Sequence, residues 1–394
     1  MNNNAYLIES IAPLVFRSGK PFGSQASAQD TVFPLPSSAA GLIRALSIEQ
    51  GMGQYQQYAQ KLADTEYQKL LSIPVQGPFL VRFDSEKPDA YTVLVPKPAN
   101  ALYFENRETK ETHLVRLSPQ AFDQEQCGSD LPEGLLPVQM QQDIKGKPQS
   151  GVAYWSLSHF LAWQQGQDLS FSEVEKAGLK ALPIDIRTHV ALDDTSLAAE
   201  DGKLFQTASF DLAHSQKEKN GGWNNERYGF LLLSPQLLKK DMATFGGERR
   251  LSYFKPVALA ADLQVPQNLV EKINQAQGFS LTLLTPSIFA NGYLPQWLDQ
   301  KTLQGVLPDT QVKVQLKAVA IDRWFAVSGW DSVVWKPKAT RKAVSAGSVY
   351  WFELCDGATL SQELMQQLWA VSLADHPQDQ KDGFGMAIFA PWTK

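Results

Sequence analysis

One succession of predicted elements, a strand, a helix, a glycine-containing loop and a second strand, occurs twice along this chain. In its first occurrence, residues 228–233 are predicted to form a strand, and Ser234-Pro235 to begin a helix. Serine as N-cap and proline at the first helical position are typical of a helix start, and Gly246 is placed where a helix would end. A strand over residues 251–254 follows.

The second occurrence lies in the C-terminal third. A strand over residues 348–354 precedes Thr359-Leu360-Ser361-Gln362, which has the pattern of a capping box at the start of a helix. Gly383-Phe384-Gly385 then precedes a strand over residues 386–389. Two successive β-α-β-β-α-β units account for this doubled pattern.

Three further segments fit this plan. Residues 6–16 are mostly apolar and predict an opening strand. Ser37 is a candidate N-cap for a helix whose apolar residues fall on one face. Residues 184–192 and 204–210 are strand-like runs around a polar segment and predict a hairpin with a long tip.

These elements predict an α+β protein of two tandem units. Its 394 residues suit two domains, and we place the first over residues 1–258 and the second over residues 259–394. Residues of about 97–182 are predicted to be a large insertion in the first unit, because no sustained period runs through their central part.

The motifs of common enzyme classes are missing from the sequence. No two of the five histidines stand at helical ligand spacing, and Cys127 and Cys355 form no C-x-x-C pair. Gly19-Lys20 and Gly146-Lys147 are each followed by proline, where a phosphate-binding loop requires Ser or Thr for magnesium. The sequence therefore predicts no catalytic residue, metal ion or cofactor.

Charge is distributed unevenly. Asp and Glu outnumber Lys and Arg by 41 to 36, which excludes a uniformly basic nucleic-acid surface but not a local basic patch. Residues 336–342 carry four positive charges and no acid, and they lie among aromatic residues that include Trp324 and Trp330. Cations for phosphates beside flat rings for bases suit single-stranded RNA, although such loops are more often simply solvated.

The candidate RNA-binding residues come from this basic segment, from other predicted loops, from one predicted helix and from one predicted strand. They are Arg17, Lys20, Arg44, His189, Arg249, Arg250, Lys338, Arg341 and Lys342. The apolar runs are too short to span a bilayer, and the N-terminus lacks the features of a signal peptide. We therefore expect a cytoplasmic protein without membrane contact.

Several motifs, in order along nearly the whole chain, resemble one family. The pieces are residues 17–23, Phe33-Pro34-Leu35-Pro36, residues 40–44, Thr285-Pro286, residues 291–298, residues 327–331, residues 346–352 and Gly383-Phe384-Gly385. Together they resemble the third Cmr subunit of type III-B CRISPR effector complexes, a member of the repeat-associated (RAMP) proteins. Ser18 departs from the family, in which an acidic residue is common at that position.

The resemblance implies two tandem ferredoxin-like, RRM-like RAMP domains, in agreement with the doubled unit. It implies a non-catalytic subunit of a ribonucleoprotein that defends against foreign nucleic acid. Such a subunit caps the guide RNA (crRNA) by binding its repeat-derived 5′ tag and bridges the large polymerase/cyclase-type subunit to the backbone subunits. Contact with target RNA would be indirect.

Two alternatives remain at this stage. Related RAMP proteins are metal-independent endoribonucleases that process guide RNA precursors, and His189, near the end of a predicted strand, is the best candidate for a general acid or base. The third possibility is a scaffold that contacts only protein.

Overall fold

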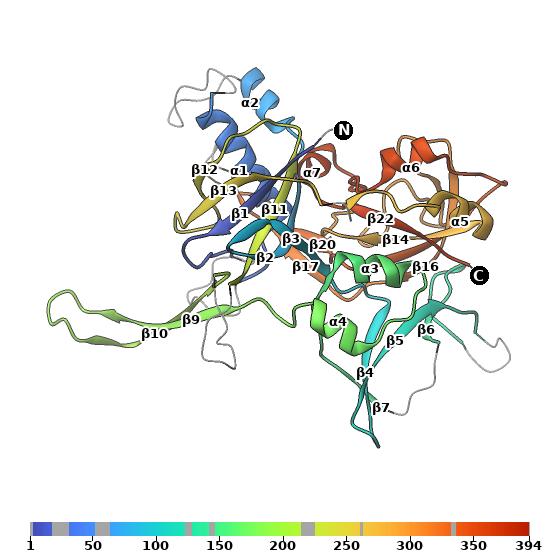
Figure 1. Ribbon diagram of the computed structural model, residues 1–394, viewed down its shortest axis with the longest axis horizontal. Coiled ribbons are helices and arrows are strands. Elements are labelled where there is room, and N and C mark those ends of the chain that lie inside the picture. Colours follow the sequence, from blue (N-terminus) through green and yellow to red (C-terminus); the bar gives the residue numbers. More distant parts are fainter. Residues whose placement is uncertain are drawn as a thin grey trace. The chain divides into compact units, whose positions relative to one another are not determined.

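The computed structural model describes residues 3–17, 31–51, 64–122, 128–141, 146–213, 225–260, 263–331 and 336–393. The chain forms two compact units, each assembled from separate stretches. The first contains residues 1–91, 182–258 and 326–341, and the second contains residues 92–181, 259–325 and 342–394. Both are mixed structures of helices and mostly antiparallel strands, as the sequence predicted for the fold class (Figure 1).

The first unit is built on one antiparallel sheet. Six of the seven strands of this sheet run in the order β12-β13-β1-β11-β2-β3. In chain order they are β1 (Asn4–Ser10), β2 (Gln76–Asp84), β3 (Lys87–Pro96), β11 (Glu226–Ser234), β12 (Asp241–Thr244) and β13 (Leu251–Val257). The opening strand is thus confirmed, but it ends before Pro13, since proline cannot donate to a ladder.

Helix α1 (Pro36–Glu49) packs against β2, and a short helix α2 (Asp64–Leu71) follows. The predicted Ser37 cap is wrong: Leu35 occupies the N-cap position and makes no side-chain hydrogen bond. In the core, the Tyr6 ring stacks on Phe254 with centroids 4.7 Å apart. Burial raises the pKa of the Tyr6 hydroxyl.

The predicted helix between Ser234 and Gly246 is also wrong. Residues 237–240 have no regular structure, and the next four residues form the edge strand β12. The reason is tertiary: the Tyr6 hydroxyl accepts a hydrogen bond from Leu238 N (2.9 Å) and donates one to Gln236 O. These long-range bonds engage backbone groups that a helix would pair internally, and β12 pairs with β13 instead.

The second unit has a sheet in the order β15-β16-β21-β14-β22. The strands are β14 (Gly278–Leu283), β15 (Gln304–Val306), β16 (Lys313–Ala320), β21 (Val349–Leu354) and β22 (Ala387–Pro391). Every residue of β14 is buried, and Phe279 stacks on Phe352 with ring centroids 5.3 Å apart. Buried and more exposed residues alternate along β16, the pattern of a strand with one covered face.

Within the described residues of 259–325 and 342–394, the second unit has three helices: α5 (Leu269–Ala276), α6 (Gln362–Leu368) and α7 (Pro377–Asp382). The predicted helix after residue 359 is confirmed as α6, but its cap is Ser361, whose hydroxyl accepts from Leu364 N at 3.1 Å. The glycine loop before β22 packs against the rest of the unit, because Phe384 is buried and Gly385 N donates to Pro286 O at 2.7 Å.

Residues 92–181 are folded and group with the second unit, whereas the sequence analysis placed all of them in the first, those from about 97 on as an insertion. They contain a sheet in the order β6-β5-β4-β7 together with β8 and two helices. The bounds are β4 (Ala101–Asn106), β5 (Thr112–Pro119), β6 (Val138–Met140), β7 (Gly146–Gln149), β8 (Tyr154–Ser156), α3 (Leu157–Gln164) and α4 (Phe171–Ala177). Leu136 N donates to Lys317 O at 2.7 Å, and Leu136 and Val138 pack on a cluster that includes Trp351, which explains the grouping.

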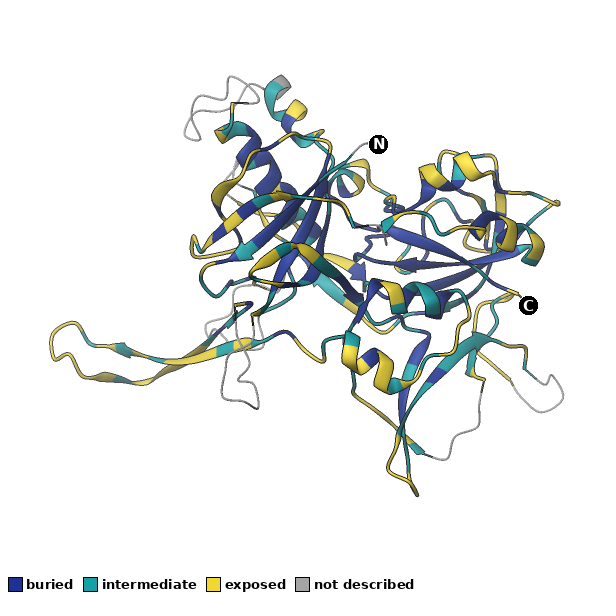
Figure 2. Cartoon of the chain, viewed as in Figure 1, coloured by how far each residue is buried: buried dark blue, intermediate teal, exposed yellow. Residues whose placement is uncertain are grey.

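Two smaller features complete the fold. β9 (Ile184–Leu192) and β10 (Ala199–Phe210) form a two-stranded ribbon that extends from the first unit, as the predicted hairpin (Figure 1). Residues 324–344 contain four short strands in two pairs. They are β17 (Trp324–Val327), β18 (Trp330–Asp331), β19 (Lys336–Pro337) and β20 (Arg341–Val344). In Figure 2 the sheets are dark blue and buried, whereas much of the β9–β10 ribbon is exposed.

Candidate nucleic-acid interface

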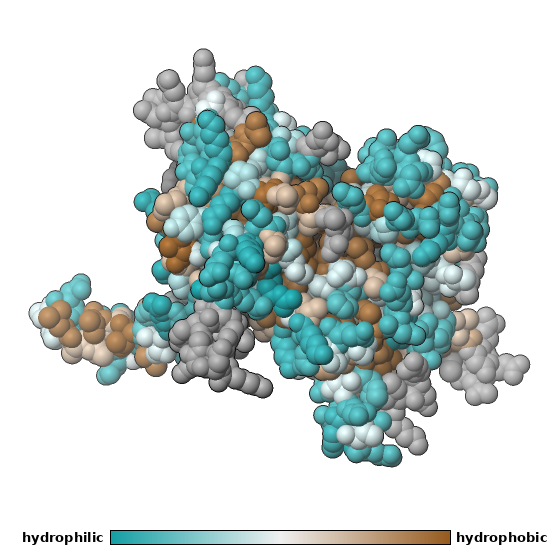
Figure 3. Space-filling view, viewed as in Figure 1, coloured by the Kyte–Doolittle hydropathy of each residue, from teal (hydrophilic) through white to brown (hydrophobic). Residues whose placement is uncertain are grey.

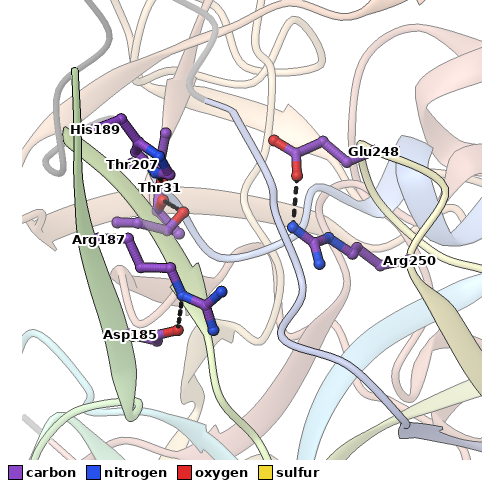
Figure 4. Close-up of polar contacts among 8 residues, drawn as sticks. Thr31, Asp185, Arg187, His189, Thr207, Glu248 and Arg250 are labelled. Atoms are coloured by element: carbon purple, nitrogen blue, oxygen red, sulfur yellow. Dashed lines mark hydrogen bonds and ion pairs between the residues drawn. The ribbon is translucent and has the colours of Figure 1, made fainter. Parts of the chain in front are cut away.

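A pocket of about 290 Å³ lies in the first unit, between the β9–β10 ribbon and the turn that joins β12 to β13 (Figure 4). We call it the ribbon pocket. Pro13 and Val15, which follow β1, also line it. The side chains that could contact a ligand are Arg187, His189, Phe205, Thr207, Glu248 and Arg250.

The register of the ribbon explains why four of these residues meet. Phe205 pairs with His189 and Thr207 pairs with Arg187, so all four side chains project from one face. His189 Nε2 and Thr207 Oγ1 share a hydrogen bond of 2.8 Å. The imidazole also stacks on the Phe205 ring, with centroids 5.2 Å apart and planes at 18°. The histidine is therefore held in one orientation by two neighbours.

The opposite wall comes from the turn between β12 and β13. Gly246 has a φ of +86°, and a Cβ there would lie 2.6 Å from Val15 O, so only glycine fits. Glu248 and Arg249 also have positive φ values. Gly247 N donates to Val15 O at 2.8 Å, which holds the turn against the segment after β1.

Both pocket arginines are paired with an acid on their own strand or turn. Arg250 Nη2 lies 2.8 Å from Glu248 Oε2, and Arg187 Nε lies 2.7 Å from Asp185 Oδ2. Such ion pairs at partly exposed positions contribute little, so a phosphate could replace either acid. Arg250 Nε is buried and has no hydrogen-bond partner among the described residues.

A second cationic and aromatic pair lies in the second unit. Lys342 Nζ sits 4.9 Å from the ring centroid of Trp324, whose side chain is 60% exposed. An exposed indole with a cation over its face is a surface on which an unpaired base can stack. In the first unit, Lys338 and Arg341 are also exposed, and Lys338 N donates to Gly329 O at 2.8 Å.

The structure brings only some of the sequence candidates together. His189 and Arg250 line the ribbon pocket, and Arg249 lies exposed in the adjoining turn. Arg17 is exposed and forms an isolated bridge with Thr31. Lys20 lies outside the described residues.

Arg44 differs from the other candidates because it is buried in α1. Its Nη2 donates to Leu71 O at 3.1 Å and to Ile73 O at 3.0 Å, which ties the helix to the segment before β2. These contacts give Arg44 a structural role, so its RNA-binding role stays an untested prediction.

Sequence reasoning missed Arg187, Phe205 and Thr207. Arg187 and His189 are two residues apart on a predicted strand, so their shared face could have been inferred from period-two alternation. Phe205 and Thr207 needed the hairpin register, which depends on the irregularity between Ala199 and Leu204.

Neither a metal site nor a membrane span is found in the part of the chain that the structure describes. Within it, no group of three or more His, Cys, Asp and Glu side chains is placed to hold a metal ion. No helix there is long and apolar enough to cross a bilayer.

Comparison with known proteins identifies a family. The model of the family described as CRISPR-associated protein (Cas_Cmr3) matches residues 6–392. No curated protein matches the chain.

Solved structures also match over nearly the whole chain. A chain of the type III-B Cmr-beta complex bound to cognate target RNA is 14% identical, with a TM-score of 0.48 and coverage of 97% of this chain and 96% of that one. A chain of the Csm3–Csm4 subcomplex of the type III-A interference complex is 11% identical, with a TM-score of 0.37 and coverage of 99% and 100%. The family model decides the assignment: the chain belongs to the Cas_Cmr3 family and is a RAMP-type subunit of the Cmr complex, as its motifs implied.

Proposed function

We propose that this chain is a non-catalytic subunit that holds the repeat-derived 5′ tag of the guide RNA in a type III-B CRISPR complex. It also bridges the large polymerase/cyclase-type subunit to the backbone subunits. The observation that carries the RNA-binding proposal is the ribbon pocket, which combines two arginines with an aromatic pair and a hydroxyl. An unpaired nucleotide offers a phosphate for the arginines and a base for the rings.

The proposal includes two tandem ferredoxin-like units. Four central strands of each sheet can be numbered one to four in the order in which they occur along the chain. Across both sheets, these strands then lie side by side in the order four, one, three, two. The strands are β13-β1-β11-β2 in one sheet and β22-β14-β21-β16 in the other. All of these neighbours are antiparallel, which is the arrangement that a β-α-β-β-α-β unit produces.

The geometry of His189 supports binding over cleavage. General acid–base cleavage of RNA needs groups free to take and give protons at the reacting oxygens. His189 Nε2 is engaged by Thr207, and the imidazole face is covered by Phe205. Among the described residues that line the ribbon pocket, His189 is the sole histidine, so this part of the lining offers no second imidazole to complete an acid–base pair.

The test measures binding of the purified chain to a guide RNA with its 5′ tag, and to the same RNA without the tag, at several salt concentrations. The double variant Arg187→Ala/Arg250→Ala should weaken tag binding and lower the salt slope by roughly 0.7 per lost phosphate contact. Lys313→Ala is the matched control, because Lys313 is an exposed cation in the second unit that is paired with Asp356. Equal affinity and slope for wild type and double variant would contradict the proposal.

Incubation of the chain with unprocessed repeat RNA separates the endoribonuclease alternative. Specific cuts that disappear in His189→Ala would favour processing. Crosslinking of the tag in the assembled complex tests the scaffold alternative, which predicts that the tag crosslinks only to other subunits.

A further inference from the structure

The sheet of the second unit leaves no open face for a ligand. Every residue of β14 is buried, and alternate residues of a strand point to opposite faces, so both faces of the sheet are covered. On one face, Trp351 belongs to a cluster against which Leu136 and Val138 pack. Helix α5 packs on β14 and β22, and in Figure 3 the surface over α5 and α6 is mostly hydrophilic. Bases therefore find no open sheet here, unlike the sheet on which they stack in an RRM.

A nucleotide contact in this unit would need a flat ring and a cation away from the sheet. Three contacts between a cation and an aromatic ring occur among the described residues, and two of them are already occupied. Arg116 lies over the buried Trp163, and its guanidinium donates to Trp163 O and Gln167 O. Lys255, in the first unit, lies 5.2 Å from the ring centroid of Tyr253, but its charge is paired with Glu9.

The third contact, between Lys342 and Trp324, is open to solvent. Both residues are exposed, and no acid among the described residues is ion-paired with Lys342. The acid nearest to Trp324 in the sequence is Asp322, which acts on Lys97: burial lowers the pKa of Lys97, and the Asp322 charge opposes that effect. The ammonium of Lys342 is therefore available to a phosphate.

The strands that carry this ring and this cation are anchored. Trp324 begins β17 and Lys342 lies in β20, and the two strands pair with each other. At the end of β20, Val344 exchanges backbone hydrogen bonds of 2.8 and 3.0 Å with the buried Ser287. The ring and the ammonium are thus held close together before any ligand arrives, so little conformational entropy is lost on binding.

The β17–β20 pair and the β9–β10 ribbon occupy corresponding connections of the two sheets. The ribbon lies between β2 and β11, the second and third of the four central strands of the first sheet. The β17–β20 pair lies between β16 and β21, which are second and third in the other sheet. Each connection places a nitrogen-bearing side chain on an aromatic ring, His189 on Phe205 and Lys342 on Trp324.

We infer that Trp324 and Lys342 form a second contact for unpaired RNA, separate from the ribbon pocket. A base stacks on the exposed indole, and the ammonium pairs with a phosphate of the same strand. Because every base has a flat face, this contact distinguishes unpaired from paired RNA and tolerates any sequence. The inference deepens the proposed function and rests on it for the identity of the RNA.

The experiment compares Trp324→Ala, Trp324→Phe and Lys342→Gln with the wild type, each as the full chain. The probes are the guide RNA with its 5′ tag, the same RNA without the tag, and the tagged RNA annealed to a complementary strand. Tyr253→Ala is the matched control, because Tyr253 is an exposed ring beside a lysine whose charge is already paired. Affinity is measured at several salt concentrations, together with the melting temperature.

Trp324→Ala should weaken binding of both unpaired RNAs by roughly tenfold, with the salt slope unchanged, because a stacking contact releases no counterions. Trp324→Phe should recover most of the loss, since it keeps a flat ring. Lys342→Gln should instead lower the salt slope by roughly 0.7, the effect of one lost phosphate contact. Tyr253→Ala should behave as the wild type, and all melting temperatures should agree.

Three outcomes would overturn the inference. One is wild-type affinity of Trp324→Ala for the unpaired RNAs, and another is an equal loss on paired and unpaired RNA. The third is unchanged RNA affinity with weaker binding to a purified Cmr subunit, which would make the occupant a protein. Failure of the proposed function would appear separately, as unchanged tag affinity in Arg187→Ala/Arg250→Ala, because the Trp324 contact is also measured on RNA without the tag.

Discussion

The same six-residue turn occurs once in each unit, but its leucine has a different environment in each. In the first unit, residues 193–198 form the tip of the β9–β10 ribbon, and in the second, residues 299–304 lead into β15. In both, the aspartate side chain accepts bonds from the backbone N–H groups two and three residues later. The aspartate backbone N donates to the carbonyl five residues on, at 2.9 Å in the first turn and 2.8 Å in the second.

The fifth residue of each turn is a leucine with a left-handed φ, +54° at Leu197 and +57° at Leu303. Leu197 is 74% exposed and Leu303 is 1% exposed. The pattern Asp-x-x-Ser/Thr-Leu therefore specifies the local turn without specifying burial. Burial depends on whether another part of the chain covers the turn.

The largest expected effect separates the two leucines. Leu303→Ala should lower the free energy of unfolding by about 3 kcal/mol, since it removes a buried side chain and leaves a cavity. Leu197→Ala should change it by less than roughly 0.5 kcal/mol, as is usual for an exposed position. Urea denaturation followed by tryptophan fluorescence measures both. Equal losses would show that the tip of the ribbon is buried in solution.

A second effect concerns the cations on the strands beside the two turns. Arg187→Glu, on β9, should weaken guide-RNA binding by roughly tenfold at low salt and less at high salt, because it places an acid in the ribbon pocket. Lys313→Glu, on β16, makes the same change of charge outside the pocket and should have a much smaller effect. Filter binding at two salt concentrations distinguishes them, and equal losses would mean that only net charge matters.

A smaller effect is expected from the backbone strain at Leu197. A side chain in the left-handed region costs about 1 kcal/mol. Leu197→Gly should therefore raise the free energy of opening the ribbon tip by about 1 kcal/mol. Leu197→Ala keeps the Cβ and serves as the control. Amide hydrogen exchange at the tip reports the opening, and identical exchange in the two variants would contradict the strain.

The smallest effect is a pH dependence at the two aspartates. Hydrogen bonds from Ser196 lower the pKa of Asp193, and bonds from Thr302 lower the pKa of Asp299, in both cases below the ordinary value of 3.8. A lowered folded-state pKa stabilises the fold above the unfolded pKa, and this stabilisation is lost as the pH falls through the folded value.

The wild type should therefore be more stable than Asp299→Asn at neutral pH, and the difference should shrink as the pH falls below about 4. Asp193→Asn should leave global stability unchanged at every pH, because the ribbon tip can open without the rest of the unit. Denaturation at a series of pH values measures both variants. A pH-independent difference for Asp299→Asn would contradict the lowered pKa.

Local pattern predicted much of the secondary structure. The hairpin predicted from residues 184–192 and 204–210 appears in the structure. Helix α6 also appears, with its cap shifted to Ser361. These features depend on hydrogen bonds and side-chain contacts between residues close in sequence, so a short window contains the necessary information.

Of the site, the sequence supplied His189 and Arg250 but not their neighbours. His189 was selected as a strand-end histidine and Arg250 as a loop cation, whereas the stacking of His189 on Phe205 depends on the register of two strands. The burial of Arg44 was equally invisible, because its partners are carbonyl groups 27 and 29 residues further along the chain.

By itself, then, the sequence determined the α+β class, the β9–β10 hairpin, helix α6 and the motifs that identify a Cas_Cmr3 protein. The tertiary structure decided that residues 241–244 form a strand instead of a helix, and that residues 92–181 pack with the second unit. It also decided which face of β9 borders the ribbon pocket. Turns and alternation are set by interactions over a few residues, whereas register, packing and burial depend on segments that are far apart in the chain and meet only when it folds.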